Sequence, residues 1–340
     1  MPFPKIDELV KLFSVDVSER ARVLASRYGF RDYMVERYYM MFGDWDVVEE
    51  LLKSFDRGLN KVVRCNTLKV SNCGYLVERL SRLGFTLRSV GWCGYAFEVL
   101  SEGFVSLGAT HEFLAGMYYV HRGLATLLPP IILSPKPSDR VLDLAAGVGG
   151  KTTHLSQIMG GSGVVVAVDV DRVKVRALRS NLERLGVYNV VVVRMDGRLV
   201  PEVFGEGFFS KVLLDAPCTG EGIIQVDRSR RFKTDVVDLV RASQLQYELL
   251  MTALRSVCSG GYVLYSTCSI APEEGEFVVD LVLNDFDGVE VADIPKIVDF
   301  YSGITEFGRS RFSDDLRRCV RTYPHVHGME GFFICLLRKL

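Results

Sequence analysis

The chain has 340 residues, of which 48% are hydrophobic, enough to build a catalytic domain with a smaller appendage. A formal net charge of -1 excludes any argument for nucleic-acid binding from overall charge, so such a claim must rest on local basic clusters. Since no run of 18 apolar residues and no apolar leader occurs, we expect a cytoplasmic monomer without a membrane segment.

Eight cysteines are present, none in a C-x-x-C pair and none at a zinc-ligand spacing. We therefore expect reduced thiols and no disulfide framework. Six of them are expected to be inert, namely Cys65, Cys73, Cys93, Cys258, Cys319 and Cys335. His325 and His327 have no third ligand nearby, so we expect no metal site.

The N-terminal part is predicted to hold two units. Apolar residues at helical spacing predict a helical segment over residues 1–57. Residues 58–125 are predicted to form a small α+β unit that resembles an RNA-recognition domain. Its expected elements are strands at 62–68, 85–90 and 96–100, a helix at 75–83, and a helical stretch at 111–128.

Residues 126–340 carry the strongest pattern, buried strands that alternate with helices. Strands are predicted at 141–144, 164–168, 190–193, 212–214 and 262–265, and helices at 152–158, 173–185 and 242–257. Continuous Val and Leu runs joined by helices predict a parallel sheet covered on both faces. Ligands bind such sheets beyond the carboxyl ends of the strands.

A glycine-rich turn follows the first of these strands and leads into a helix. It contains Gly147, Gly149 and Gly150, which allow a ligand close to the backbone. Asp169 ends the second strand, where an acid can bind ribose hydroxyls, and Asp196 follows the third, where an adenine amino group can be read. These features predict a nucleoside site; the alternative is turn glycines and helix-capping acids.

Two other nucleotide-binding folds compete with this interpretation. Gly150-Lys151-Thr152 imitates the end of a P-loop of a nucleotide hydrolase, but Ala145 stands where that loop needs glycine. A nicotinamide-binding fingerprint would need a small residue at Thr152. Neither alternative explains the cysteines that follow.

Cys218 and Cys268 each follow a predicted strand, so both should face one pocket at the carboxyl edge of the sheet. C5 of cytosine attacks a methyl donor only after a thiolate adds to C6, and a second thiol can then promote loss of the C5 proton. Asp215 can hydrogen-bond the N3 edge of the base, and Lys151 can help to hold a thiolate.

The motifs Asp215-Ala-Pro-Cys218-x-Gly-Glu-Gly222 and Ser266-Thr-Cys268-Ser269 resemble those of the RNA cytosine-5 methyltransferases of the Sun/NSUN type. The resemblance implies a Rossmann-like class I fold with a mostly parallel seven-stranded sheet and helices on both faces. It also implies Cys268 as nucleophile, Cys218 as the release cysteine, and closing hairpin strands at 323–325 and 331–333. The residues implied to line the S-adenosylmethionine and cytosine pockets are Ala145, Ala146, Gly147, Val148, Gly149, Gly150, Lys151, Asp169, Asp196 and Asp215.

The loop departs from the family pattern at Val148, which stands where the family usually has proline, and loss of the proline makes the loop less preorganised. We expect the substrate to be RNA, with transfer RNA favoured and ribosomal RNA as the other choice. The expected RNA contacts are Arg64, Asn66, Lys69, Arg228, Arg230 and Arg231. A non-catalytic RNA-binding assembly factor with the same fold is a further alternative.

Overall fold

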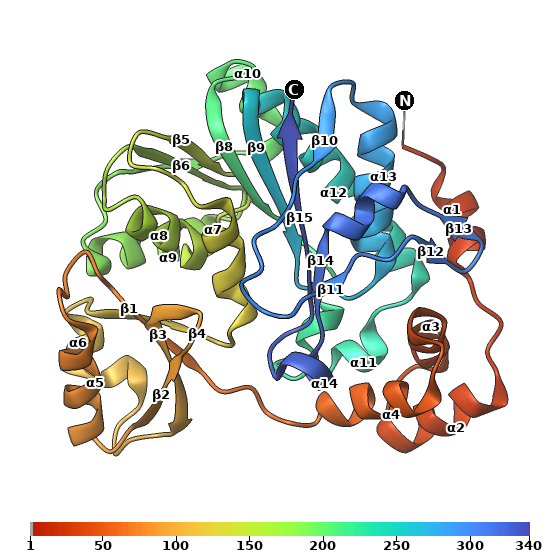
Figure 1. Ribbon diagram of the computed structural model, residues 1–340, viewed down its shortest axis with the longest axis horizontal. Coiled ribbons are helices and arrows are strands. Elements are labelled where there is room, and N and C mark those ends of the chain that lie inside the picture. The colour runs from red at the N-terminus through yellow and green to blue at the C-terminus, as the bar shows by residue number, and fades with distance from the viewer. Residues whose placement is uncertain (1–2) are drawn as a thin grey trace.

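Helices form the N-terminal part of the computed structural model, which describes residues 3–340 (Figure 1). They are α1 (Ile6–Phe13), α2 (Glu19–Tyr28), α3 (Asp32–Phe42) and α4 (Trp45–Ser54). The side chains of Ser18 and Asp44 start α2 and α4 by accepting hydrogen bonds from backbone N–H groups of the first turn. Tyr38 of α3 belongs to a buried cluster that includes Ile224 and Ile270 of the catalytic domain. These helices are therefore packed onto the catalytic domain.

The small subdomain is an antiparallel sheet of four strands in the order β2-β3-β1-β4, with one long helix against it. Its elements are β1 (Val62–Cys65), α5 (Cys73–Arg82), β2 (Thr86–Val90), β3 (Cys93–Ser101) and β4 (Tyr118–His121). Leu76 and Leu80 of α5 are buried in one cluster with Phe97 and Val99 of β3. The α+β organisation expected for this region is confirmed.

Residues 111–128 contain strand β4, where the sequence pattern predicts a helix. The helix α6 (His111–Leu114) ends before Gly116, whose φ is +72° and whose added Cβ would lie 1.8 Å from the Arg184 carbonyl oxygen. The chain then pairs with β1, so that Tyr118 lies opposite Cys65. That pairing is long-range, which is why local periodicity does not reveal it.

The catalytic sheet has nine strands, in the order β11-β14-β15-β9-β8-β5-β6-β7 with β10 also paired to β15. The strands are β5 (Arg140–Asp143), β6 (Val164–Asp169), β7 (Val190–Arg194), β8 (Phe209–Asp215), β9 (Val257–Thr267), β10 (Val289–Val291), β11 (Tyr301–Ser302), β14 (Val320–Thr322) and β15 (Phe332–Lys339). Strands β9, β8, β5, β6 and β7 are parallel, and β15 is antiparallel to β9. The sheet has two strands more than the seven expected, because the short β10 and β11 are added at its antiparallel end.

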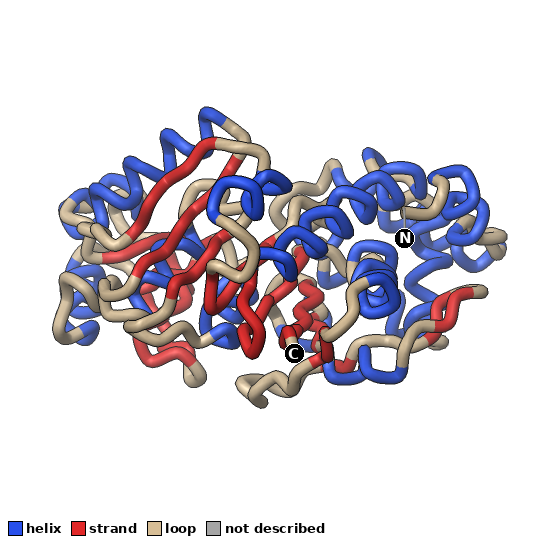
Figure 2. Tube along the Cα trace, turned by 90° about the horizontal axis from the view of Figure 1, so that it is seen from above, coloured by secondary structure: helices blue, strands red, loops and turns tan. Residues whose placement is uncertain are grey.

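Helices cover both faces of this sheet, as the view from above shows (Figure 2). Val165 of β6 packs with Leu155 of α8 on one face, whereas Val166 and Val168 pack with Leu250 of α12 on the other. The larger helices are α7 (Leu128–Leu133), α8 (Gly150–Ile158), α9 (Arg172–Leu185), α10 (Val200–Phe204), α12 (Val236–Ser256) and α13 (Glu276–Asp285). The Rossmann-like fold is confirmed. No helix in residues 3–340 has the length and apolarity needed to cross a bilayer.

The closing hairpin differs in one detail from its expected boundaries. β14 ends at Thr322, and the next residues form a helical turn, α14 (Pro324–His327), instead of continuing the strand. Pro324 suits the first turn of a helix because it has no N–H to donate to a strand. Tyr323 and His325 therefore lie outside the sheet, and β15 begins at Phe332.

Two pairs of cysteines form disulfides, so the expectation that all eight thiols are reduced was wrong. Cys65 is bonded to Cys73 and Cys319 to Cys335, with Cα separations of 5.9 and 4.4 Å. Folding brings together residues that are 8 and 16 positions apart in the sequence, which spacing alone does not reveal. Cys93, Cys218, Cys258 and Cys268 are free.

Candidate active site

The turn between β5 and α8 forms one wall of a cavity of about 370 Å³ at the carboxyl edge of the sheet. Gly147 and Gly149 have φ of +56° and +91°, a conformation that favours glycine. A Cβ at Gly149 would also lie 2.4 Å from the Leu178 side chain. The backbone N–H of Ala146 donates to Val168 O, which fixes the turn against β6.

Most of the residues expected to bind the cofactor line this cavity. They are Ala145, Ala146, Gly147, Val148, Gly150, Lys151 and Asp215. Asp169 stands behind the turn, where Oδ2 accepts a hydrogen bond of 2.8 Å from the Gly147 N–H and Oδ1 accepts one from the Asp171 N–H. Asp196 is held by the Arg198 guanidinium at 2.6 Å, and this pairing lowers the pKa of the Asp196 carboxyl. Contacts of Gly149, Asp169 and Asp196 with a nucleoside stay predictions.

Lys151 and Asp215 form an ion pair inside the cavity. Lys151 Nζ lies 2.7 Å from Asp215 Oδ2 and 3.3 Å from Thr126 Oγ1, and Ser266 Oγ donates to Asp215 Oδ1. Burial opposes the charge of Lys151, but Asp215 outweighs it and raises the pKa of Lys151. The ammonium is therefore charged, and it orients the Asp215 carboxylate toward the pocket.

Cys268 lines the same cavity, and Cys218 lies beside Cys268 but is not among the lining residues. They follow β8 and β9, which are neighbouring parallel strands, and their Sγ atoms lie 3.0 Å apart. The contact with Cys268, together with burial and the nearby carboxylates of Glu274 and Asp215, raises the pKa of Cys218. Cys218 is therefore held as a thiol beside Cys268, which lines the cavity.

Sequence reasoning missed several pocket residues. They are Tyr119, Val120, His121, Arg122, Thr126, Asp143, Ile223, Val226, Glu330 and Phe332. Tyr119, Val120 and His121 were missed because the sequence pattern predicts a helix where the structure has β4. Asp143 could have been predicted from the sequence, because it ends the strand before the glycine-rich turn. It is buried, its Oδ2 accepts from Thr152 Oγ1, and its Oδ1 has no hydrogen-bond partner in residues 3–340. Burial raises the pKa of Asp143 to about 7.

Arg64, Asn66 and Lys69, expected to contact RNA, bind the protein itself. Arg64 is 1% exposed and donates to Gly150 O and Thr153 Oγ1. Asn66 Nδ2 donates to the carbonyls of Gly116 and Leu185. The expectation was wrong for Arg64 and Asn66, because both side chains are buried inside the protein and cannot reach a phosphate. The exposed Lys69 donates from Nζ to Ala115 O and Arg184 O, so these residues join the small subdomain to the catalytic domain.

The second basic cluster is likewise used for internal contacts. Arg231 is 7% exposed and pairs with Asp56 at 2.6 Å, which contradicts its expected role at an RNA surface. Arg230 donates to Thr219 O beside Cys218. Arg228 is exposed and donates a hydrogen bond to Asp56 O. A contact of Arg228 with RNA stays a prediction.

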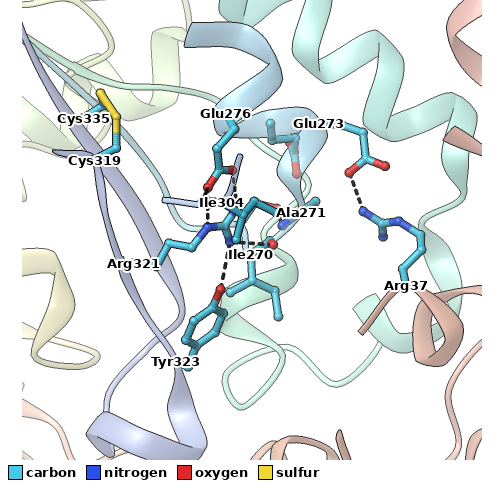
Figure 3. Close-up of polar contacts among 12 residues, drawn as sticks. Arg37, Ile270, Ala271, Glu273, Glu276, Ile304, Cys319, Arg321, Tyr323 and Cys335 are labelled. Atoms are coloured by element: carbon cyan, nitrogen blue, oxygen red, sulfur yellow. Dashed lines mark hydrogen bonds and ion pairs between the residues drawn. A yellow bond between two sulfur atoms is a disulfide. The ribbon is translucent and has the colours of Figure 1, made fainter. Parts of the chain in front are cut away.

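Buried ion pairs hold the segment that follows β9 and Cys268 (Figure 3). Arg321 pairs with Glu276 and donates to Ile270 O, and Arg37 pairs with Glu273. These residues are fully or almost fully buried, so loss of one partner leaves an uncompensated charge. No group of three or more His, Cys, Asp or Glu side chains in the described part of the chain is arranged to hold a metal ion.

Comparison with known proteins gives consistent matches. Residues 130–338 match the family model described as 16S rRNA methyltransferase RsmB/F. The chain is 37% identical over 321 residues to a human 28S rRNA (cytosine(4447)-C(5))-methyltransferase, covering 93% of this chain and 38% of the human protein. It is 33% identical over 301 residues to ribosomal RNA small subunit methyltransferase F of Vibrio campbellii, covering 86% of this chain and 60% of that protein. The crystal structure of a methyltransferase homolog protein from Pyrococcus horikoshii has a TM-score of 0.83 at 35% identity, covering 95% of this chain and 100% of that one.

Proposed function

Because the chain belongs to the RsmB/F family of S-adenosylmethionine-dependent RNA methyltransferases, we propose that it methylates C5 of a cytosine in ribosomal RNA. The observation that carries the proposal is the pair of thiols 3.0 Å apart beside the Lys151–Asp215 ion pair. Ribosomal RNA replaces the expected preference for transfer RNA, which has no support among the relatives described above.

The pocket fits the cofactor that the family implies. Its volume of about 370 Å³ lies within the range of small-molecule sites, and the glycine turn exposes backbone to it. Asp143 Oδ1 is buried and has no hydrogen-bond partner among residues 3–340, so it is available to a polar group of a ligand. Ala145 to Lys151 would hold S-adenosylmethionine, which when bound supplies an electrophilic methyl group.

Cys268 performs the nucleophilic step in this proposal. Its thiolate adds to C6 of the cytosine, and the electron pair of the C5–C6 double bond moves to C5. The C5–methyl bond would form as the methyl–sulfur bond of the donor breaks, which would leave the donor sulfur as a neutral thioether. Asp215 hydrogen-bonds the N3 edge of the ring, and Lys151 keeps that carboxylate in place. Loss of the C5 proton then restores the C5–C6 double bond and expels the Cys268 thiolate. Cys218, in contact with Cys268, assists this release.

A concave surface on the catalytic domain supports an anionic polymer as substrate. It is lined by Arg172, Arg176, Arg179, Arg194 and Val175. The three arginines of α9 recur every three to four residues and so share one helix face. None of the four arginines pairs with a carboxylate among the described residues. Unpaired guanidinium groups gathered on one surface suit RNA phosphates. By contrast, most of the arginines that the sequence predicted as RNA contacts bind groups within the protein.

Two cysteine variants test the proposal on ribosomal RNA from a strain that lacks the gene. Cys218→Ala should form an adduct with RNA that survives denaturing electrophoresis, because addition proceeds and release fails. Cys268→Ala should form no adduct and transfer no labelled methyl group, while its affinity for S-adenosylmethionine is unchanged. Methylation by Cys268→Ala would refute the assignment. Normal function of a Cys268→Ala strain would favour the non-catalytic assembly factor.

A further inference from the structure

We propose that Glu274 is a positioning residue that sets the relative placement of the two reactive cysteines, an inference that rests on the proposed function. Glu274 ends the short 3-10 helix η5 (Pro272–Glu274) and is completely buried. It does not line the cavity, so any effect on the reaction must act through other residues.

The Glu274 carboxylate clamps the loop that carries Cys218. Oε1 accepts a hydrogen bond of 2.8 Å from the backbone N–H of Thr219, and Oε2 accepts one of 2.6 Å from the Thr219 hydroxyl. Thr219 directly follows Cys218. Gln246 Nε2 donates to Glu274 Oε1 and also to Pro217 O, on the other side of the cysteine. Both neighbours of Cys218 are therefore tied to one carboxylate.

The same carboxylate reaches the loop that carries Cys268. Burial raises the pKa of the Glu274 carboxyl, whereas the side chain of Ser269, the residue after Cys268, interacts with this carboxyl and lowers its pKa, as Thr219 and Gln246 also do. The backbone joins the loops as well, since Gly222 N–H donates to Cys268 O. Glu274 therefore links the residue after each cysteine, and the 3.0 Å between the two Sγ atoms depends on this link.

Its acidic neighbours have a different environment. Glu273 and Glu276 are also fully buried, but each pairs with an arginine, Arg37 and Arg321 respectively (Figure 3). Glu274 has no Lys or Arg within ion-pair distance in residues 3–340. A buried carboxylate without a counter-ion is costly unless several donors satisfy it, and here those donors belong to the cysteine loops. Its negative charge also keeps Cys218 protonated.

Glu274→Gln tests the inference, with Glu273→Gln as a matched control. An amide keeps only one accepting oxygen and carries no charge. With its N–H₂ at the Oε2 position the Thr219 hydroxyl must accept instead of donate, and with its N–H₂ at the Oε1 position it meets the N–H donors of Thr219 and Gln246. Cys218 should shift, and the covalent RNA adduct should accumulate in Glu274→Gln although both cysteines are present. Adduct formation should slow by less than about fivefold and release by more than about tenfold, as small misplacements of reacting groups produce. Glu273→Gln should lower the melting temperature without adduct accumulation.

Thr219→Val keeps the backbone contact and removes only the hydroxyl. It should accumulate adduct to a smaller extent, and it tests the inference even if Glu274→Gln does not fold. Cys218→Ala on the same RNA is the reference: if it traps no RNA, the proposed function fails, and this inference fails with it. If Cys218→Ala traps RNA but folded Glu274→Gln and Thr219→Val release product at the wild-type rate, only the role of Glu274 is overturned.

Discussion

Lys151 Nζ and Asp215 Oδ2 lie 2.7 Å apart, and this pair connects the turn after β5 to the end of β8. The two strands are neighbours in the sheet, and their following residues point into one cavity. The pair can form because the parallel sheet brings the ends of these two strands together. The pair in turn fixes the Asp215 side of the pocket.

Lys151→Met should slow methyl transfer about a hundredfold at saturating RNA and cofactor, since removal of one charged group that orients a catalytic partner costs this much. The partly buried Asp215 would lose its cation and its fixed orientation. Single-turnover methylation measures the effect. Lys53→Met, at a half-buried position of helix α4 outside the cavity, serves as the control. A wild-type rate in Lys151→Met would contradict a role for the pair in the reaction.

Stability should fall as the pH rises from about 4 to 7, because burial raises the pKa of Asp143 from 3.8 to about 7. In this window the folded chain keeps a proton that the unfolded chain has released. The stabilisation from this proton is fully present below pH 3.8 and is lost as the pH rises through about 7. Between these values the free energy of unfolding falls by up to about 1.4 kcal/mol per pH unit. Asp143→Asn should remove this slope in denaturant unfolding between pH 5 and 8. If the free energy of unfolding varied with pH in the same way in the wild type and in Asp143→Asn, the raised pKa of Asp143 would be contradicted.

Arg64→Ala should lower the free energy of unfolding by about 3 kcal/mol, because buried hydrogen bonds between two subdomains are lost. Affinity for S-adenosylmethionine should fall too, since Arg64 holds Gly150 and packs over Tyr119, which both line the cavity. Arg82→Ala, which breaks an exposed pair with Glu78, should change stability by less than about 1 kcal/mol. A stable Arg64→Ala protein with weakened RNA binding would restore the original expectation of an RNA contact.

Replacement of Arg176 and Arg179 by alanine should weaken RNA binding and reduce its salt dependence. Loss of two phosphate contacts should lower the slope of log K against log salt by about 1.5. Filter binding at several salt concentrations measures this slope, with Arg20 and Arg22 replaced together as the control on exposed helix α2. Methylation at saturating RNA should not change. An unaltered slope would exclude this surface as the RNA contact.

Reduction of the disulfide between Cys319 and Cys335 should destabilise the protein by about 3 kcal/mol, because the unfolded chain regains the freedom of a loop of this size. The bond joins Cys319, which directly precedes β14, to Cys335 inside the neighbouring strand β15 (Figure 3). Denaturant unfolding of Cys319→Ala measures the loss. Thiol titration of the unfolded, non-reduced protein should give the four free cysteines, and eight would refute both disulfides.

Local sequence determined the parallel part of the sheet and the main features of the pocket. Val and Leu runs bounded by glycine turns appear in the chain itself, and strand ends of a parallel sheet must meet at one edge. For this reason the sequence predicts that Cys218, Cys268, Asp215 and Lys151 lie together, and the structure places Lys151 against Asp215 and Cys218 against Cys268.

Only the tertiary structure decided which polar residues face the pocket and which hold the domains together. Arg64 was expected at an RNA surface and lies buried, whereas β4 was expected as a helix and contributes Tyr119 and His121 to the pocket. Disulfide partners and the contacts of Glu274 were also invisible, because they join segments far apart in the chain. Burial and long-range pairing set these outcomes, and neither is a property of a short stretch of sequence.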